Sequence, residues 1–331
     1  MSRLCHRLGW MLVALSLFLH FFTVYCHIAQ PDRFAAFLVM PIWVWGGIGL
    51  FISCFAFCFL RAPLSMVVSL VWIITLLIGA DEAIPLAHLT YDAPKPGVAA
   101  LYQRQPVIRV VTLNCYNGLL RSAAKSIELW QPDIVLLQEV QPYQVQEIAN
   151  ELYGGGGDYR AYHQNGIITR WKIQREVRNP ILRNQQATVL LPNGRKIEVV
   201  SLHLASAATD LRLWERKAWL KHRDNRVKRR QELTATLQIL EQTSDFPNTP
   251  VLLGGDFNAP PSDQVHNLLR RDFVNAYASV GTGLGNTYHR RFPILRIDHL
   301  YSTRHLTPVR CRAVTTRQSD HRLVVADYRM P

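Results

Sequence analysis

The first 80 residues of the chain contain three apolar stretches, which constrain its folding more than any other feature of the sequence. These stretches span residues 8–29, 34–60 and 64–80. The first two exceed the roughly 20 residues that a helix needs to cross the hydrocarbon core of a membrane, and the third lies at the lower limit. We therefore expect three transmembrane helices. The alternatives are a signal peptide, for which residues 23–27 offer a poor cleavage site, and buried helices of a soluble core.

Positive charges beside these stretches predict the orientation of the chain. Arg3 and Arg7 precede the first stretch, and Arg61 lies between the second and the third. Only Arg33, next to Asp32, lies between the first and the second. Because Lys and Arg are retained mainly on the cytoplasmic side, we expect the N-terminus in the cytoplasm. Three crossings of a plasma (inner) membrane would then place everything after residue 80 outside the cytoplasm.

Charge is distributed unevenly along the chain. Residues 1–90 carry four Lys or Arg and three acids, a net charge of +1, whereas residues 91–331 carry 33 and 21, a net charge of +12. A basic domain suits a polyanion or an anionic membrane surface as its partner, although the charge also serves solubility. Residues 81–106 contain four prolines and are expected to form a semi-extended linker to a soluble domain at 107–331.

The six cysteines argue against a disulfide-stabilised domain and against a zinc-binding domain. They are too sparse for a disulfide framework in a chain of 331 residues, and no C-x-x-C or Cys/His cluster predicts a zinc site. Only Cys115 and Cys311 belong to the soluble part. We expect both to be buried free thiols, although an oxidising compartment would permit their pairing.

Apolar strands alternate with helical segments in the soluble part. Strands are expected at residues 107–113, 134–137, 166–168, 187–191, 196–204, 251–258, 296–301 and 323–328, and helices at 122–130, 142–152, 211–242 and 264–269. The Pro192-Asn193-Gly194 sequence predicts a hairpin turn between two of these strands. This alternation predicts an α/β fold in which hairpins add antiparallel pairs to parallel ones.

Residues 251–261 form the most informative stretch of the soluble part. Three apolar residues end a buried strand, two glycines permit a sharp turn, and two prolines prevent the strand from continuing. Between them, Asp256 and Asn258 are two residues apart, so they point to the same face of an extended backbone. For an isolated Asp-x-Asn sequence, an Asx-turn capping the strand would be the simpler interpretation.

Other polar residues follow buried strands in the same way. The full set is Asn114, Glu139, His203, Asp256, Asn258, Asp298, Asp320 and His321. Each one alone has an ordinary structural explanation, such as a solvated cap or a hydrogen-bonded core histidine. Their repeated position at strand ends indicates a single polar site.

The sequence resembles the endonuclease/exonuclease/phosphatase superfamily over about residues 107–330. The resemblance rests on Thr112-Leu113-Asn114, Leu137-Gln138-Glu139, Ser201-Leu202-His203, Gly255-Asp256-Phe257-Asn258, Ile297-Asp298-His299 and Ser319-Asp320-His321. It implies a four-layer sandwich of two mixed β-sheets flanked by helices. Membrane-anchored bacterial members share the layout of a short helical bundle followed by this domain.

The resemblance also implies a metal site. Glu139, helped by Asn114, would hold Mg²⁺ or Mn²⁺ through oxygen, as suits hard cations, and Asp320 would lie near the same ion. No other cofactor is expected.

For the catalytic residues, the resemblance implies distinct roles. Asp256 would activate or orient the attacking water, and Asn258 would position the water and the phosphate. His321 would contact the phosphate and be oriented by Asp298, while His203 would assist with the phosphate or the leaving group. Metal and imidazolium together would neutralise charge that develops on the phosphoryl oxygens.

These features predict a membrane-anchored, divalent-metal-dependent phosphoric ester hydrolase. The substrate stays open between nucleic acid and a phospholipid or lipid-linked phosphate, and an inactive membrane-tethered binding protein is the alternative outside the enzyme class. The membrane contact is expected through residues 8–80, with no obligate protein partner. Residues 212–232 carry nine Lys or Arg and three acids. A solvated helix face explains them most simply, and a surface for a polyanion or anionic lipid is the functional alternative.

Overall fold

The computed structural model describes residues 3–60, 63–83, 107–116, 123–179, 182–207 and 212–330. The chain divides into two compact units, one of residues 1–86 and 209–224 and one of residues 87–208 and 225–331. Residues 84–106, which make up most of the predicted linker, lie outside the described residues.

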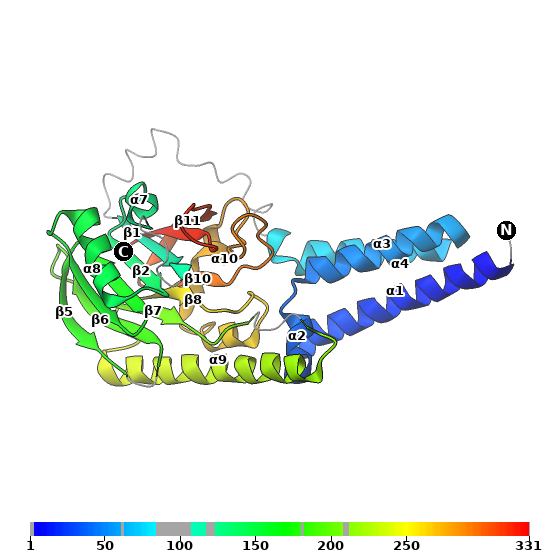
Figure 1. Cartoon of the computed structure of the whole chain (residues 1–331), viewed down its shortest axis with the longest axis horizontal. Coiled ribbons are helices and arrows are strands. Elements are labelled where there is room, and N and C mark those ends of the chain that lie inside the picture. Colours follow the sequence, from blue (N-terminus) through cyan, green and yellow to red (C-terminus); the bar gives the residue numbers. More distant parts are fainter. Residues whose placement is uncertain are drawn as a thin grey trace. The chain divides into compact units, whose positions relative to one another are not determined.

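The first unit contains the apolar helices. They are α1 (Arg3–Ala29), α3 (Ile42–Leu60) and α4 (Pro63–Gly79), with the short segments η1 (Asp32–Phe34), α2 (Ala35–Leu38) and η2 (Asp81–Ala83) (Figure 1). The core between the long helices is formed by Val13, Ala56, Val68 and Trp72. Gly49 faces the Trp72 ring so closely that a Cβ at this position would lie 2.1 Å from it.

The second predicted transmembrane stretch is not one continuous helix. The chain bends by 72° between Asp32–Leu38 and Ile42–Cys58. Pro41 explains the break, because proline lacks an amide donor and disfavours helical geometry in the residue before it. By length and composition, Leu4–Ala29 is apolar enough to cross a membrane, the bent pair would provide a second crossing if it acts as one span, and Leu64–Gly79 is shorter. Three transmembrane helices are therefore not confirmed.

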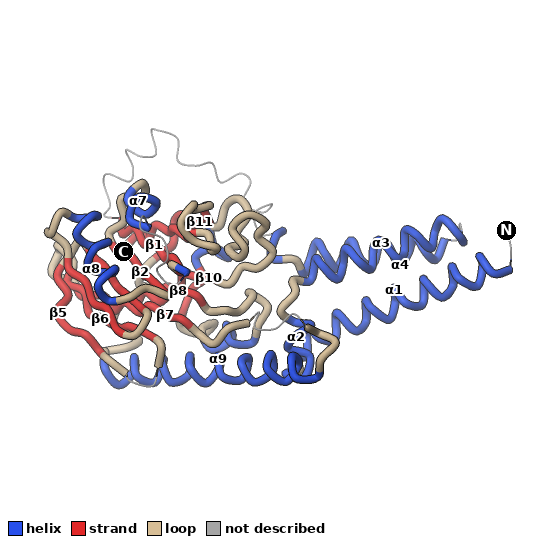
Figure 2. The backbone as a smooth tube through the Cα atoms, viewed as in Figure 1, coloured by secondary structure: helices blue, strands red, loops and turns tan. Residues whose placement is uncertain are grey.

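The second unit contains two six-stranded sheets (Figure 2). The first sheet has the order β11 (Thr307–Val314), β12 (Leu323–Arg329), β1 (Val107–Asn114), β2 (Ile134–Gln138), β4 (Asn165–Thr169), β3 (Asp158–Tyr162). The second has the order β5 (Lys172–Val177), β6 (Asn184–Leu190), β7 (Lys196–His203), β8 (Val251–Asp256), β10 (Asp298–Thr303), β9 (Phe273–Asn275). The pairs β1–β2 and β7–β8 are parallel, and the other pairs are antiparallel.

Helices cover the outer faces of the two sheets. They are α7 (Ala123–Glu128), α8 (Pro142–Tyr153) and α9 (Arg216–Thr243), with the short 3₁₀ segment η4 (Gln264–Leu268), whereas α10 (Ala276–Val280) contributes Ala276 and Tyr277 to the core between the sheets. α7 and α8 pack on the first sheet, and α9 packs on the second through residues such as Leu233 and Leu240. Figure 1 shows α9 running along the β7–β8 side of this unit.

Successive side chains of each strand alternate between the central core and an outer helical layer, and this alternation produces the four layers of the fold. Val110 belongs to the core between the two sheets, whereas its neighbour Val111 packs outward against the α7 and α8 layer. In the second sheet, Leu252 faces the central core and Leu253 faces α9. Strands buried on both faces read as continuous apolar runs, since successive side chains point in opposite directions. The four-layer sandwich is confirmed.

Four strands were not predicted: β3, β5, β9 and β11. They are the edge strands of the two sheets. An edge strand is less buried than a central one, so it needs no continuous apolar run. The sequence of β5, Lys-Ile-Gln-Arg-Glu-Val, is an example.

Candidate active site

Strand ends bring the predicted site residues of the first sheet together. The parallel strands β1 and β2 end side by side at Asn114 and Gln138, and Glu139 follows directly. The antiparallel strand β12 begins just after Asp320 and His321, so these residues lie at the same end of the sheet. Because β1 and β2 run parallel, Asn114 and Glu139, which are 25 positions apart in the sequence, meet at one edge of the sheet.

The second sheet contributes the facing half of the site. His203 ends β7 directly opposite Asp256 at the end of β8, and Asp298 begins β10 opposite Asp256 on its other side. Gly255 has φ +136, and a Cβ here would lie 2.1 Å from the Leu202 carbonyl oxygen. Glycine is thus required where the strand turns the Asp256 side chain toward the first sheet.

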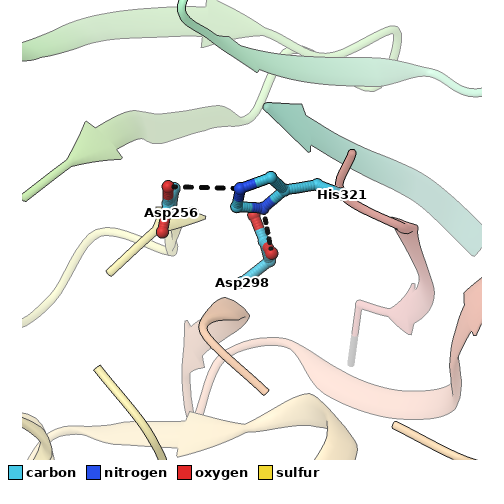
Figure 3. A group of neighbouring side chains, drawn as sticks. All are labelled: Asp256, Asp298 and His321. Carbon is cyan, nitrogen blue, oxygen red and sulfur yellow. Dashed lines mark hydrogen bonds and ion pairs between the residues drawn. The ribbon is translucent and has the colours of Figure 1, made fainter. Parts of the chain in front are cut away.

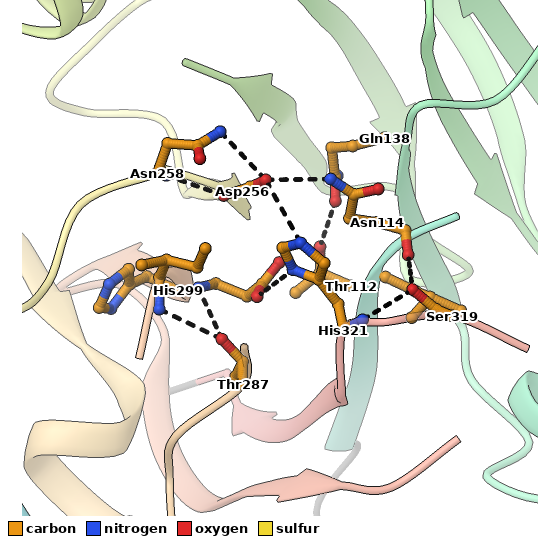
Figure 4. A network of polar contacts seen from close by, with 12 residues as sticks. Thr112, Asn114, Gln138, Asp256, Asn258, Thr287, His299, Ser319 and His321 are labelled. Atoms are coloured by element: carbon orange, nitrogen blue, oxygen red, sulfur yellow. Dashed lines mark hydrogen bonds and ion pairs between the residues drawn. The ribbon is translucent and has the colours of Figure 1, made fainter. Parts of the chain in front are cut away.

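The Asp256 carboxylate lies at the centre of the polar network (Figure 4). Asn114 Nδ2 donates to its Oδ2 at 3.0 Å, and Asn258 donates its backbone N–H to Oδ1 at 2.8 Å and its Nδ2 to Oδ2 at 3.1 Å. Asp256 is 1% exposed. Burial, reinforced by the negative charge of Asp298, raises the pKa of Asp256. A carboxylate with a raised pKa is suited to accept a proton near neutral pH.

His321 lies between two carboxylates (Figure 3). Its Nδ1–H donates to Asp298 Oδ2 at 2.8 Å, and its Nε2 lies 4.0 Å from Asp256 Oδ2. Burial alone would lower the pKa of His321, but the charge and hydrogen bond of Asp298 outweigh it and raise the pKa to about 10. Asp298 therefore holds His321 as an imidazolium whose Nε2–H points to the centre of the site.

A second histidine approaches the same centre. His203 Nε2 lies 3.6 Å from Glu139 Oε1 and 3.9 Å from Asp256 Oδ2. Asn114 joins these two carboxylates, since its Nδ2 also donates to Glu139 Oε1 at 3.0 Å. The Asn114 Oδ1 accepts the Tyr116 backbone N–H at 2.9 Å, so the amide presents its nitrogen, rather than its oxygen, to the site.

Two groups of side chains could hold a metal ion. Glu139 and Asp320 supply the oxygen ligands that hard cations prefer, and Asp320 Oδ1 is a buried atom with no hydrogen-bond partner among the described residues. Asp256, Asp298 and His321 form the other group, with ligand atoms within 4.8 Å of one another. The Asp298–His321 hydrogen bond already occupies two of those atoms. The chemistry of the donors therefore favours the Glu139 side.

Several residues that position this site had no assigned role in the sequence analysis. Ser319 Oγ donates to the Asn114 carbonyl oxygen at 2.6 Å and accepts the His321 backbone N–H, which ties β12 to β1. Thr287 Oγ1 accepts the backbone N–H of Asp298 at 3.2 Å. The Tyr288 ring lies 5.0 Å from the His321 ring. Ser319 was part of a quoted motif, but Thr287 and Tyr288 lie in a loop without a spacing signal.

The basic segment of α9 is partly internal. Arg226 and Arg229 are each 1% exposed, and both donate to Asp263 Oδ2 at 3.1 Å. Arg229 also donates to the carbonyl oxygens of Ala205 and Ser206, just after His203. The interpretation of this segment as one solvated or polyanion-binding face is therefore wrong for these two arginines.

Cys115 and Cys311 are both buried free thiols, as predicted. Cys115 packs in the outer layer of the first sheet, whereas Cys311 belongs to the core between the sheets. Burial raises the pKa of each thiol to about 12, so neither is a reactive thiolate at neutral pH.

The site consists of a buried carboxylate flanked by two histidines at one edge of a four-layer α/β sandwich. Such an arrangement is suited to hydrolysis, because the carboxylate can accept a proton from water. The sequence profile of the Endonuclease/Exonuclease/phosphatase family matches residues 111–321, and the chain belongs to this family. Enzymes of the family hydrolyse phosphate esters and generally use divalent metal ions. No curated protein sequence matches the chain.

Solved structures share the fold at low sequence identity. An endonuclease/exonuclease/phosphatase from Bacteroides vulgatus is 17% identical, with a TM-score of 0.56, covering 69% of this chain and 100% of its own. The Bacteroides thetaiotaomicron mannosyl-6-phosphatase Bt3783 is 16% identical, with a TM-score of 0.53 and coverage of 67% and 99%. The human Nocturnin catalytic domain with bound sulfate is 20% identical, with a TM-score of 0.53 and coverage of 69% and 96%.

Proposed function

We propose that the protein is a membrane-anchored, divalent-metal-dependent phosphoric ester hydrolase. The observation that carries this proposal is the environment of Asp256. Its carboxylate accepts three N–H groups and lies within 4.0 Å of Nε2 of both His203 and His321. Such a group can orient a water molecule and accept its proton while two imidazoles face the phosphate.

Each of the remaining residues acts on the phosphate or on Asp256. His321, held protonated by Asp298, donates its Nε2–H to a phosphoryl oxygen and stabilises the negative charge that grows there. Asn258 and Asn114 fix the orientation of the Asp256 carboxylate. His203, on the opposite side of Asp256, contacts the phosphate or protonates the leaving group.

The proposed metal ligands are Glu139 and Asp320, with Asn114 as a further candidate. The Asn114 amide would have to turn to present its oxygen, since its nitrogen faces Glu139 and Asp256 here, and Asn258 would then orient the Asp256 carboxylate without it. A bound Mg²⁺ or Mn²⁺ would supply Lewis-acid stabilisation of phosphoryl oxygens.

The polarity of the first unit supports a membrane anchor. Along α1, α3 and α4, many large apolar side chains are exposed, among them Phe18, Phe21, Phe51, Met66 and Ile78. Its buried polar side chains include Ser16, His20 and Ser53, each of which forms a hydrogen bond with a neighbouring helix. Ser16 Oγ donates to the Gly49 carbonyl oxygen at 2.8 Å and accepts from Trp72 Nε1 at 3.0 Å. Apolar surfaces outside and hydrogen-bonded polar groups inside are the arrangement that a lipid environment favours.

We therefore propose a membrane segment at 1–80, a linker at 81–106 and a catalytic domain at 107–331. The proposed location is the plasma (inner) membrane, with the catalytic domain outside the cytoplasm, where lipid-linked phosphates or scavenged nucleic acid are the available substrates. No protein partner is required by this proposal.

Hydrolysis assays on the purified full chain test the function. The substrates are single- and double-stranded DNA, RNA, phosphodiester lipids and polyprenyl pyrophosphates, each with Mg²⁺, with Mn²⁺ and with a chelator. We expect hydrolysis of at least one class that stops on chelation and returns on adding the metal. Binding without hydrolysis in every class would instead support an inactive membrane-tethered binding protein.

A further inference from the structure

The structure separates the basic stretch of residues 212–230 into two parts. Arg226 and Arg229 are buried in the second compact unit, which contains the candidate active site and which we term the catalytic unit. Residues 209–224, in contrast, belong to the compact unit that contains the apolar helices. Residues 212–224 carry five Lys or Arg and two acids, a net charge of +3. The cationic surface of this shorter segment is therefore part of the proposed membrane anchor.

Trp219 fixes the start of α9 within this unit. Its ring packs against a cluster of Cys26, Phe37 and Leu38, and its Nε1 donates to the Leu213 carbonyl oxygen at 2.7 Å. Cys26 lies near the end of α1, and Trp45 of the first turn of α3 belongs to the same cluster. Figure 1 shows the start of α9 beside α2.

This end of the helices has the composition of a membrane–water interface. Trp43 Nε1 donates to Glu82 at 2.9 Å, which places the start of α3 beside the end of α4. Tyr25 and Trp45 lie at the same end, at the last turn of α1 and the first turn of α3. Trp and Tyr are enriched at the level of lipid headgroups. The start of α9 therefore lies where the headgroups of a surrounding bilayer would be.

The outward face of this segment matches anionic headgroups. Trp214 is 81% exposed, and the side chains of Arg216, Lys217 and Lys221 are all exposed. None of these three cations forms an ion pair with the described residues, whereas Arg223 pairs with Asp224 at 2.8 Å. An exposed tryptophan beside unpaired cations is the composition of helices that lie in an anionic lipid interface.

We propose that the surface of Trp214, Arg216, Lys217 and Lys221, which we term the α9 basic patch, binds the headgroups of anionic lipids. This proposal rests on the proposed membrane anchoring and is independent of the catalytic activity. A nucleic-acid substrate is the other polyanion that such cations would attract. The lipid is favoured because the patch belongs to the same compact unit as the apolar helices.

The test uses the full chain in nanodiscs of phosphatidylcholine, with and without phosphatidylglycerol. A water-soluble amine reagent modifies exposed lysines, and mass spectrometry measures the rate at each position. We expect Lys217 and Lys221 to react at least about five-fold more slowly with phosphatidylglycerol present, the factor that about one cation contributes at an anionic surface. The exposed Lys172 and Lys196 of the catalytic unit should react equally in both discs. High salt should remove the difference.

A second measurement compares two variants that each lose three positive charges. The R216Q/K217Q/K221Q variant is expected to retain several-fold less phosphatidylglycerol per protein after purification from mixed lipid than the K125Q/K172Q/K196Q control does. Equal retention by both variants, or equal lysine modification in the two discs, would overturn the proposal. Protection that appears on adding DNA to phosphatidylcholine discs would assign the patch to nucleic acid instead.

The same experiments distinguish failure of the membrane anchor, on which the lipid patch rests, from failure of the proposed activity. A chain that does not enter either disc would refute the membrane anchor and, with it, the lipid patch. A chain that enters both discs and hydrolyses no phosphate ester would refute the proposed activity alone.

Discussion

At the scale of single residues, Glu139 provides the most direct test of the metal site. The E139Q substitution keeps the size of the side chain but removes its charge, so it should weaken metal binding more than folding. We expect activity to fall by on the order of 100-fold at limiting Mg²⁺ and to recover partly as Mg²⁺ is raised. A Mg²⁺ titration of both proteins measures this. The exposed Glu147 on α8 is the matched control, and E147Q should behave as wild type. Unchanged activity and metal dependence in E139Q would remove Glu139 from the site.

The Asp298–His321 pair makes a second residue-level prediction. Because Asp298 acts through the imidazole that it orients at 2.8 Å, its loss should matter little once His321 is absent. We expect H321A and D298A each to lower kcat/KM by about 10²–10⁴-fold, and the double variant to lose about as much as H321A alone. Steady-state kinetics of the three variants, with the exposed-residue variant H163A as control, decides the matter. Losses that multiply in the double variant would count against the pairing.

At the scale of elements, α9 is held to the catalytic unit by a buried ion-pair group. Arg226 and Arg229 bind Asp263, and Glu232 Oε2 accepts the Ala205 backbone N–H at 2.8 Å. Ala205 follows His203 and Leu204 directly in the chain. The Leu204 carbonyl oxygen accepts a hydrogen bond from the Asn258 side chain at 3.0 Å. The helix therefore stabilises the loop that follows a proposed catalytic residue.

Acid should unfold the catalytic unit partly through Asp263. Burial alone would raise the pKa of Asp263, but Arg229 and Arg226 outweigh it and hold this pKa below its usual range. A carboxyl group with a lowered folded-state pKa contributes stability above its unfolded pKa of about 3.9 and loses it as pH falls through the folded value. We expect D263N to destabilise the unit by about 3–5 kcal/mol at neutral pH, since two buried guanidinium groups lose their carboxylate.

Urea unfolding of the full chain in detergent, at neutral pH and below pH ~4, measures this contribution. The difference between D263N and wild type should shrink as the pH falls. The control D272N changes an acid that is 38% exposed and should shift neither value. A D263N protein as stable as wild type at neutral pH would show that the ion pairs contribute nothing net.

At the scale of the whole molecule, the number of membrane crossings decides where catalysis takes place. Two crossings, by α1 and the bent pair, would leave the catalytic domain on the same side as the N-terminus, whereas a third crossing by α4 would put it on the opposite side. We expect three crossings. A C-terminal alkaline phosphatase fusion, which is active only outside the cytoplasm, should therefore be active, and a C-terminal fluorescent protein exported in the same way should be dark. The reciprocal pattern would place the domain in the cytoplasm.

The sequence by itself determined the eight central strands, the family and the polar residues of the site. Strands buried on both faces need continuous apolar runs, and chemistry at strand ends leaves polar residues just after those runs, so both features are local and visible. The roles proposed for these residues still await the experiments above. The four edge strands were missed because their exposure relaxes the apolar pattern.

Only the tertiary structure decided which side chains meet. Parallel pairing of β7 with β8 sets His203 opposite Asp256, and the loop before β10 supplies Thr287 to fix Asp298. Composition counted Arg229 as surface charge, because its partner Asp263 lies 34 residues away in sequence. Burial of a charge depends on such distant partners, and a count of charges along a helix contains no information about them.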